Sequence, residues 1–288
     1  MSHPIGIFDS GLGGLTVVRA IRRRLPAEPI VYFGDTARVP YGTKSSRTVV
    51  RFALEDCAFL WRYGPKCIVV ACNTASAAAL GALRQRFDRP VCGVIEPGAR
   101  AAVAAARGRP IGVIGTEATI ASGAYREAIR RLAPEARVLQ QACPLLVPLV
   151  EEGRAADDPI VRMALAEYVG PLRRAGIGAL VLGCTHYPLL ADAVRDALGP
   201  DVALVDSAES AAQDVASRLA ADGLLAEGGT GEVRWFVSDH PDRFRSVGAR
   251  FLGEPIGAVT LVAPEVFFEP YPGLSPGLEL PRAMEERA

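Results

Sequence analysis

Two of the six cysteines stand where a buried strand is expected to give way to a helix. Cys72 follows the apolar run CIVVA and precedes NTASAAALGALRQRF, and Cys184 follows ALVLG and precedes THYPLL, where Pro188 suits the first turn of a helix. At such a junction, unpaired N–H groups and the helix dipole favour a thiolate. Both are therefore candidate acid–base groups. The other cysteines lie within helix or strand patterns or beside a proline, as small buried thiols do: Cys57, Cys67, Cys92 and Cys143.

The segment Asp9–Gly14, DSGLGG, combines an acid, a hydroxyl (Ser10) and a glycine-rich turn ahead of a helix, where bare N–H groups can approach an anion. It is a weak dinucleotide fingerprint, because Thr16 occupies the place of the third glycine in GxGxxG. No GKS or GKT of a Walker loop follows. The turn also resembles the phosphate loop of sugar-kinase and actin-like ATPases, so a nucleotide-binding phosphoryl-transfer protein is the alternative hypothesis.

One histidine and one turn complete the candidate residues. His186, in GCTHYP, lies two positions beyond the second candidate cysteine and could tune its thiol or relay its proton, unless it is a structural histidine. His3 and His240 lie near an end and in a polar loop, and we expect both to face solvent. Tyr41 and Gly42, in ARVPYGTKS, are predicted to form a turn whose N–H and phenol could hold a carboxylate.

Short runs rich in Val and Ile alternate with segments of helical periodicity, which predicts an α/β fold with largely parallel sheets. Ligands of such sheets gather at the carboxyl ends of the strands, where the polar residues above stand. The expected strands are Pro4–Phe8, Ile30–Phe33, Cys67–Ala71, Val91–Val94, Pro110–Ile114, Val138–Gln140, Ala179–Leu182 and Ala203–Val205. The clearest expected helices are Gly14–Arg24, Ser45–Arg62 and Thr74–Phe87.

Three strand ends recur in the same order in the two halves of the chain. IGIFDSG is echoed by IGVIGTE, KCIVVACNT by GALVLGCTH, and VIEPGARAA by LVDSAESAA. We therefore expect two similar lobes, related by a pseudo-twofold axis, whose two cysteines approach one cleft from opposite sides. The predicted domains are residues 1–97 together with 207–264, residues 98–206, and a Pro- and Gly-rich C-terminal tail over residues 265–288.

Charge balance, apolar runs and the positions of cysteine and lysine exclude several classes of partner and cofactor. The 32 Lys and Arg balance 32 Asp and Glu, so no basic field attracts nucleic acid or a membrane surface, and a small molecule is the expected ligand. No run approaches the ~18–20 apolar residues of a membrane span, and the first residues do not read as a secretory signal, so we expect a cytoplasmic protein. The chain has no CxxC, so we expect no metal site. Lys44 and Lys66 are poorly placed as Schiff-base lysines, which favours chemistry without a cofactor.

Taken together, these motifs resemble those of the glutamate racemases in the aspartate/glutamate racemase superfamily. The pair ACNTAS and GCTHYP is the most specific feature, because relatives acting on aspartate or hydantoins share the two cysteines but usually differ after them. The proline-rich stretch after Pro264 has no counterpart. The matching segments, in the family's order and spacing, are IGIFDSGLGGLTV, YFGDTARVPYG, VVACNTASA, GVIEPG, GVIGTEATI, CPLLVPLVEEG and VLGCTHYPLL.

The resemblance implies cofactor-independent interconversion of L- and D-glutamate, which supplies D-glutamate for bacterial peptidoglycan, by a protein that is usually a homodimer. It assigns removal of the α-proton of D-glutamate to Cys72 and that of L-glutamate to Cys184. Asp9 would assist the first thiol and His186 the second. The residues it implies for substrate binding are Asp9, Ser10, Tyr41, Gly42, Asn73, Thr74, Thr116, Thr119, Thr185 and His186, and Glu151 is a further candidate.

The chemistry expected from the residues agrees with that assignment. Inverting a carbon requires an acid on one face and a base on the other, which equivalent thiols from two lobes would supply. Uncharged hydroxyls, amides and main-chain N–H groups would stabilise the carbanion in a cleft that excludes water. A third hypothesis is a non-catalytic two-lobed protein that binds glutamate without exchanging its α-proton, but it leaves the matched cysteines unexplained.

Overall fold

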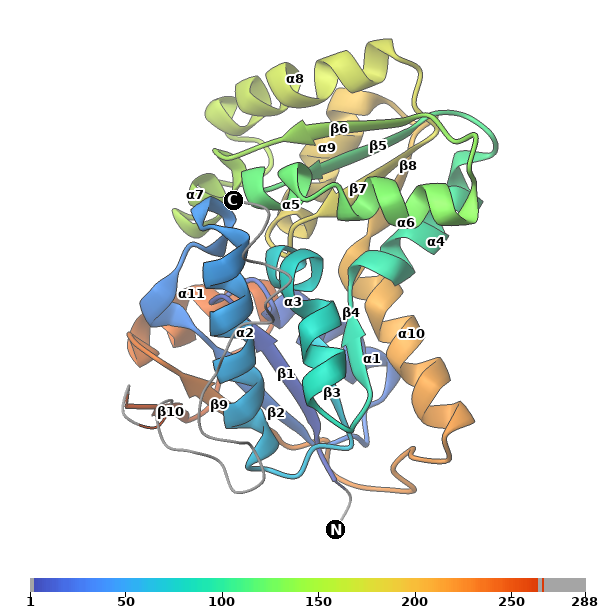
Figure 1. Cartoon of the computed structure of the whole chain (residues 1–288). Helices are drawn as coiled ribbons and strands as arrows, with labels where there is room; N and C mark the ends of the chain where they lie inside the picture. The colour runs from blue at the N-terminus through green and yellow to red at the C-terminus, as the bar shows by residue number, and fades with distance from the viewer. Residues whose placement is uncertain (1–2, 264–265, 267–288) are drawn as a thin grey trace.

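The computed structural model describes residues 3–263 and residue 266. Within this range the strands form two parallel sheets flanked by helices, which confirms the predicted α/β class (Figure 1). The strand order is β10-β9-β2-β1-β3-β4 in the first sheet and β6-β5-β7-β8 in the second. The strands are β1 (Ile5–Asp9), β2 (Ile30–Gly34), β3 (Cys67–Val70), β4 (Val91–Gly93), β5 (Ile111–Gly115), β6 (Val138–Ala142), β7 (Ala179–Gly183), β8 (Ala203–Asp206), β9 (Val233–Val237) and β10 (Val259–Leu261).

The helices begin where the local sequence supplies a cap. Ser45 accepts a hydrogen bond from the N–H of Thr48 at the start of α2, and Asp158 accepts one from Ile160 at the start of α8. The α-helices are α1 (Leu15–Arg24), α2 (Ser46–Trp61), α3 (Asn73–Arg86), α4 (Ile95–Ala106), α5 (Glu117–Ala121), α6 (Ala124–Leu132), α7 (Leu146–Glu151), α8 (Pro159–Arg174), α9 (Ala191–Leu198), α10 (Ser207–Ala221) and α11 (Pro241–Leu252). Short 3-10 turns are η1 (Thr36–Arg38), η2 (Tyr41–Thr43) and η3 (Tyr187–Leu190).

The first sheet is buried on both faces, which explains its nearly continuous apolar strands. β1 lies between β2 and β3, with Ile5 opposite Ile30 on one side and opposite Cys67 on the other. Residues of α2 and α3 form a core with one face of this sheet, around Phe8 and Phe33. Residues of α1, α10 and α11 form a core with the opposite face. The carboxyl ends of the central strands are therefore held rigidly.

The second sheet is built in the same way. β5 lies between β6 and β7, with Ile111 opposite Val138 and Ala179. α4 and α6 pack on one face, and α8 and α9 pack on the other. α4 and α10, which belong to the two connections between the sheets, pack against each other (Figure 1). No helix in the described part of the chain is long and apolar enough to cross a bilayer.

Each strand expected from the sequence is present, with ends that differ by a residue or two. The two strands that were not predicted, β9 and β10, join the first sheet beside β2. β9 carries the exposed Arg234 inside its apolar run, and β10 is a short, largely exposed edge strand, so neither has a clear apolar pattern. We retain residues 1–97 with 207–264, and residues 98–206, as a proposed division. The predicted tail, 265–288, lies outside the described residues except for Val266.

Candidate active site

The carboxyl ends of strands in both sheets border one cavity of about 200 Å³. Its walls come from the segments that follow β1, β2, β3, β5, β6 and β7, so both sheets contribute to it. This is where parallel sheets generally bind ligands. The cavity is lined by Ser10, Pro40, Tyr41, Gly42, Thr43, Cys72, Asn73, Thr74, Thr116, Glu117, Pro144, Val147, Pro148, Cys184, Thr185 and His186.

Cys72 caps the N-terminus of α3 and is 6% exposed on the cavity wall. Its Sγ accepts a hydrogen bond from the N–H of Ala75 at 3.5 Å. Burial raises the pKa of the Cys72 thiol to about 12, with a further contribution from the charge of Asp9. Hydrogen bonds from Ala75 and Ser10 lower this pKa without offsetting the increase. Cys72 is therefore a thiol at neutral pH, in position to donate a proton into the cavity.

Cys184 reaches the same cavity from the end of β7 and is also 6% exposed. The helix expected after it begins as the 3-10 helix η3 (Tyr187–Leu190), with Pro188 in its first turn, and the α-helix α9 begins only at Ala191. The chain here bonds in i→i+3 steps, with the N–H of Tyr187 donating to the carbonyl of Cys184 at 3.2 Å. The dipole of an α-helix is thus not available to this sulfur.

His186 supplies the positive charge instead. Its Nδ1 lies 3.9 Å from Sγ of Cys184, and its Nε2 lies 3.0 Å from Oε1 of Glu151. Burial by itself lowers the pKa of His186, but its interactions with Cys184 and Glu151 outweigh burial and raise the pKa to about 10. The hydrogen bond to His186 lowers the pKa of Glu151 in turn. His186 therefore places a positive charge between the carboxylate of Glu151 and the sulfur of Cys184.

Asp9 lies behind the cavity wall, fully buried at the end of β1, whereas Ser10 beside it lines the cavity. Its Oδ2 accepts a hydrogen bond from the N–H of Gly11 at 3.0 Å, and Oδ1 has no hydrogen-bond partner among the described residues. Burial raises the pKa of Asp9, against the charge of His186 and hydrogen bonds from Gly14 and Gly11. The N–H groups of this turn therefore bind the protein's own carboxylate, which gives the phosphate-loop alternative no support.

Uncharged hydrogen-bonding groups surround the two sulfurs. Thr74, in α3, lies 2.9 Å from the hydroxyl of Thr116 and 3.1 Å from that of Thr119, which belong to the segment after β5. The amide oxygen of Asn73 accepts a hydrogen bond from the hydroxyl of Tyr125 at 2.7 Å. These contacts join segments that follow strands of different sheets. They also place several neutral donors where a carboxylate could be bound.

Comparison with known proteins agrees with this geometry. Residues 5–215 match the family described as Asp/Glu/Hydantoin racemase. The chain belongs to this racemase family. The glutamate racemase of Geobacter metallireducens is 53% identical over 262 residues, which are 91% of this chain and 97% of the relative. Two solved structures are also similar. A Bacillus anthracis glutamate racemase isoform is 41% identical with a TM-score of 0.87, and the Francisella tularensis glutamate racemase in complex with D-glutamate is 39% identical with a TM-score of 0.85; each aligns over 91% of this chain and 98% of its own.

In this racemase most of the residues predicted for the site meet at the cavity. Those that line it are Cys72, Cys184, His186, Ser10, Tyr41, Gly42, Asn73, Thr74, Thr116 and Thr185. The other three stand one contact behind the wall. Thr119 lies 2.9 Å from the hydroxyl of Thr116, Glu151 contacts His186, and Asp9 precedes Ser10. Their catalytic and binding roles stay predictions.

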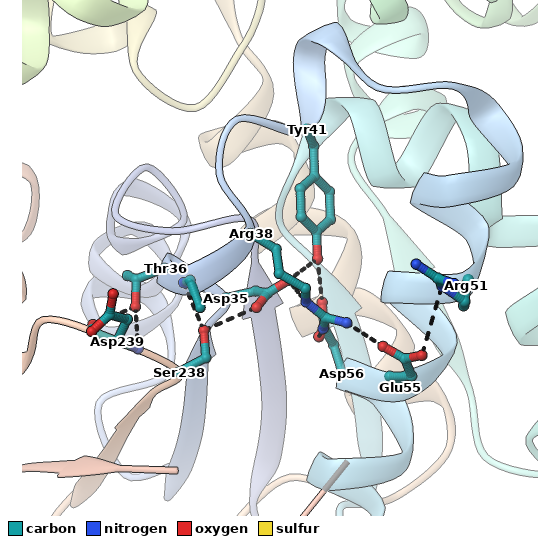
Figure 2. A network of polar contacts seen from close by, with 10 residues as sticks. Asp35, Thr36, Arg38, Tyr41, Arg51, Glu55, Asp56, Ser238 and Asp239 are labelled. Atoms are coloured by element: carbon teal, nitrogen blue, oxygen red, sulfur yellow. Dashed lines mark hydrogen bonds and ion pairs between the residues drawn. The ribbon is translucent and has the colours of Figure 1, made fainter. Parts of the chain in front are cut away.

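The phenol of Tyr41 does not serve the cavity as expected from the sequence. Its hydroxyl is directed away from the cavity, toward the carboxyl groups of Asp35 and Asp56 (Figure 2). The ring is buried, and the segment from Pro40 to Thr43 contributes to the wall. At Tyr41 and Gly42, the main chain therefore remains as the candidate carboxylate-binding group. The two acids lie outside the PYG motif, so the motif alone could not show where the hydroxyl points.

Several wall residues of this racemase were not singled out from the sequence. Thr43 follows Gly42 directly and Glu117 follows Thr116 directly, so extending the two motifs by one residue would have found them. Pro40 is the first residue of the same PYG motif. An apolar part of the wall comes from the segment around α7, within CPLLVPLVEEG, and has no polar signal to mark it: Pro144, Val147 and Pro148.

Proposed function

We propose that this protein interconverts L- and D-glutamate without a cofactor, with Cys72 and Cys184 as the two acid–base groups. The observation that carries the proposal is that both sulfurs line one cavity of about 200 Å³, although they follow strands of different sheets. The relatives that this chain resembles over most of its length are glutamate racemases, and one of them is described in complex with D-glutamate. These findings support glutamate as the substrate.

In the proposed reaction, the thiolate of one cysteine removes the α-proton of glutamate, and the electron pair of the C–H bond stays on the substrate as a carbanion conjugated with the carboxylate. The other cysteine donates its thiol proton to the opposite face of the same carbon. The first sulfur is then a thiol and the second a thiolate, so the protein is ready for the reverse reaction. Two bases are needed because one group can reach only one face of the carbon.

The residues around the two sulfurs bear on the protonation state of each cysteine before substrate binds. The raised pKa of Cys72 favours a thiol at that position, and the imidazolium of His186 lies beside Cys184. In this state Cys184 would remove the proton of L-glutamate and Cys72 would protonate the other face. We propose that Asp9 assists Cys72, because its charge is the largest electrostatic influence on that thiol after burial.

The carbanion must be stabilised because the α-proton is a very weak acid. We propose that the hydroxyls of Ser10, Thr74 and Thr185, the amide of Asn73 and main-chain N–H groups near Gly42 bind the substrate and its carboxylate. Fixed donors in a cavity that excludes water stabilise developing charge more strongly than water does. Thr116 and Thr119 would hold Thr74 in place through their hydroxyls.

We further propose a cellular role that follows from the reaction. D-Glutamate is a component of bacterial peptidoglycan, so a cytoplasmic glutamate racemase would supply cell-wall biogenesis and thereby maintain cell shape. We expect the protein to act as a homodimer and to need no nucleic acid or membrane partner. Cross-linking or sedimentation of the purified protein would test the dimer.

Replacement of either cysteine by serine tests the mechanism. Cys72→Ser and Cys184→Ser should each lower kcat/KM for racemisation by roughly 10²–10⁴-fold, because a serine hydroxyl is a far weaker acid and the proton transfer is lost on one face. Circular dichroism at single wavelengths measures the racemisation, and NMR in deuterium oxide measures exchange of the α-proton. Exchange that starts from one enantiomer can persist in each variant, since one thiol remains.

Cys92→Ser is the matched control, because Cys92 is a buried thiol in β4 that does not line the cavity. This variant should racemise glutamate at the wild-type rate. Wild-type activity in Cys184→Ser would refute the two-thiol mechanism. Binding of glutamate with no exchange of its α-proton in the wild-type protein would instead favour the non-catalytic hypothesis.

A further inference from the structure

A buried polar cluster lies directly behind the wall segment Pro40–Thr43. It consists of Asp35, Arg38, Tyr41, Glu55 and Asp56, and we call it the Asp35–Asp56 cluster (Figure 2). Its members come from the end of β2, from η1 and η2, and from α2. Asp35 and Asp56 are both fully buried. The cluster therefore places several ionisable groups in the core, one residue away from the cavity.

Arg38 faces all three acids of the cluster. Its Nε donates to Oδ2 of Asp35 at 2.6 Å, its Nη2 donates to Oδ1 of Asp56 at 2.8 Å, and its Nη1 donates to Glu55. The guanidinium also lies over the ring of Phe52, with 4.1 Å between Cζ and the ring centroid. Arg51 also approaches Glu55, at 3.9 Å, but among the described residues Arg38 is the cation paired with both buried aspartates, which leaves an excess of negative charge there if both are ionised. Burying such an excess is costly.

The contacts of the Tyr41 hydroxyl indicate that one carboxyl group of the cluster is protonated. Its hydroxyl lies within hydrogen-bond distance of Oδ2 of Asp35 and, at 2.9 Å, of Oδ2 of Asp56. A phenol carries a single hydrogen, so it can donate to only one of these oxygens. The second contact would join an oxygen lone pair to a carboxylate anion unless that carboxyl group carries a hydrogen of its own.

The remaining contacts show which acid carries the hydrogen. Asp35 accepts through both oxygens, from the hydroxyl of Ser238 at 2.9 Å on Oδ1 and from Arg38 on Oδ2, as an anion does. Asp56 accepts from Arg38 on Oδ1, whereas its Oδ2 contacts only the Tyr41 hydroxyl among the hydrogen bonds of the described residues. The hydrogen therefore belongs on Oδ2 of Asp56. That oxygen then donates to the phenol, and the phenol donates to Asp35.

We propose that Asp56 keeps its carboxyl proton, and that the chain of hydrogen bonds from Asp56 through Tyr41 to Asp35, anchored by Arg38, positions the Pro40–Thr43 wall of the substrate cavity. Asp35, Arg38 and Asp56 are positioning residues, because none of them lines the cavity. The inference rests on the proposed glutamate racemase function for its effect on substrate, but the position of the proton does not depend on it.

The charges around Asp56 agree with a retained proton. Burial raises the pKa of Asp56 well above its usual range, and the charge of Asp35 raises it further, while Arg38 opposes the increase. The titratable groups that face it are Asp35 after β2, Arg38 in η1, Tyr41 in η2, and Glu55 and Cys57 in its own helix.

The positioning matters because the wall segment fits closely against the opposite side of the cavity. A Cβ atom added to Gly42 would lie 2.8 Å from Cβ of Thr116, so even a methyl group has no room there. Drawing the Tyr41 side chain toward Asp35 and Asp56 leaves the main chain of Tyr41 and Gly42 on the cavity side. A change in that anchor would shift the segment against Thr116 or away from the substrate.

Replacing Asp56 or Asp35 by asparagine, which has nearly the same size as aspartate, distinguishes a protonated Asp56 from a cluster in which every carboxyl group is ionised. An asparagine at position 56 can accept from Arg38 through its oxygen and donate to Tyr41 through its NH₂ group, as the neutral acid does. Asp56→Asn should therefore keep KM for glutamate within about twofold of wild type. Asp35→Asn places an NH₂ group against a donor and should raise KM roughly tenfold, with a smaller effect on kcat.

Infrared difference spectroscopy observes the proton directly, without substrate. The wild-type protein minus Asp56→Asn should show the C=O band of a protonated carboxyl group. Tyr41→Phe is a second probe of positioning in case Asp35→Asn folds poorly, and it should also raise KM more than it lowers kcat. Arg51→Gln is the control, because Arg51 approaches Glu55 from the exposed surface of the same helix at 3.9 Å, and its KM should be unchanged.

Absence of the protonated-carboxyl band, or a KM for Asp56→Asn as high as that for Asp35→Asn, would overturn the assignment of the proton. Unchanged KM values in both Asp35→Asn and Tyr41→Phe would overturn the positioning role. If the wild-type protein did not racemise glutamate, the proposed function would fail, yet the infrared result would still decide where the proton lies.

Discussion

Cys72 and Cys184 occupy equivalent places after β3 and β7, yet different groups surround the two sulfurs. Cys72 receives an N–H of α3 and lies near the buried Asp9, whereas Cys184 has no α-helix start and lies beside His186. The charge of Asp9 raises the pKa of the Cys72 thiol. The two sulfurs therefore lie in different electrostatic surroundings before substrate arrives.

The charge of His186 can be tested through the pH dependence of stability. Its pKa is raised from 6.5 to about 10 in the folded protein, so folding favours the protonated ring. This stabilisation is fully present below pH 6.5 and is lost as the pH rises toward about 10. The difference in the free energy of unfolding between wild type and His186→Gln should therefore shrink over this interval. Denaturant titrations at several pH values measure it, and a difference that stays constant or grows would show that His186 is not protonated.

The glycine-rich turn between β1 and α1 packs closely against the segment after β7. Its glycines resemble those of an anion-binding loop, but in this structure they make room for that close approach. A Cβ atom added to Gly13 would lie 2.1 Å from Oγ1 of Thr185 and 2.6 Å from Nδ1 of His186. The hydroxyl of Thr16, at the start of α1, donates to the carbonyl of Thr185 at 3.1 Å. The turn therefore fixes Thr185 and His186 through close packing.

Substitution of Gly13 by alanine should disturb this element. The added methyl group would displace Thr185 and His186 from the cavity wall, and we expect Gly13→Ala to lower kcat/KM at least about tenfold, as small misplacements of catalytic groups do. The measurement is racemisation of both enantiomers. Because L- and D-glutamate have equal free energies, kcat/KM must fall equally in the two directions.

Gly81→Ala is the matched control for this element. Gly81 lies inside α3, and a Cβ atom added there would meet nothing within 4 Å. Activity should be unchanged and the protein should gain about 0.5–1 kcal/mol of stability, because alanine loses less backbone entropy in a helix. Full activity in Gly13→Ala would show that the turn does not position His186.

At the scale of the whole molecule, binding and stabilising contacts lie at opposite ends of the first sheet. The cavity is at the carboxyl ends of the strands. At the other end, before β2 and β3, Lys66 forms a buried ion pair with Glu28, with 2.6 Å between Nζ and Oε2. Lys66 also donates to the carbonyl of Leu224 at 2.7 Å, and Glu28 accepts from the N–H of Ala226 at 2.8 Å. This pair ties the segment after α10 to the first sheet.

Removal of one partner of this pair should affect stability and not catalysis. Lys66→Met leaves a buried carboxylate without its main cation and should lower the free energy of unfolding by about 3–5 kcal/mol, with KM unchanged. The double variant Lys66→Met with Glu28→Gln should recover part of this loss. Chemical denaturation and initial rates provide the two measurements. A large increase in KM in a folded Lys66→Met protein would contradict the separation of the two ends.

The sequence by itself determined the strands that carry the site, because apolar runs that end in polar residues are local signals. β3 before Cys72 and β7 before Cys184 follow from such runs, and the parallel fold then brings strand ends together. Only the tertiary structure decided the partners of individual side chains. The pairing of His186 with Glu151 and the turning of the Tyr41 hydroxyl toward Asp56 join residues from separate elements. Such contacts depend on how helices pack on the sheets, and no local pattern of residue types encodes that packing.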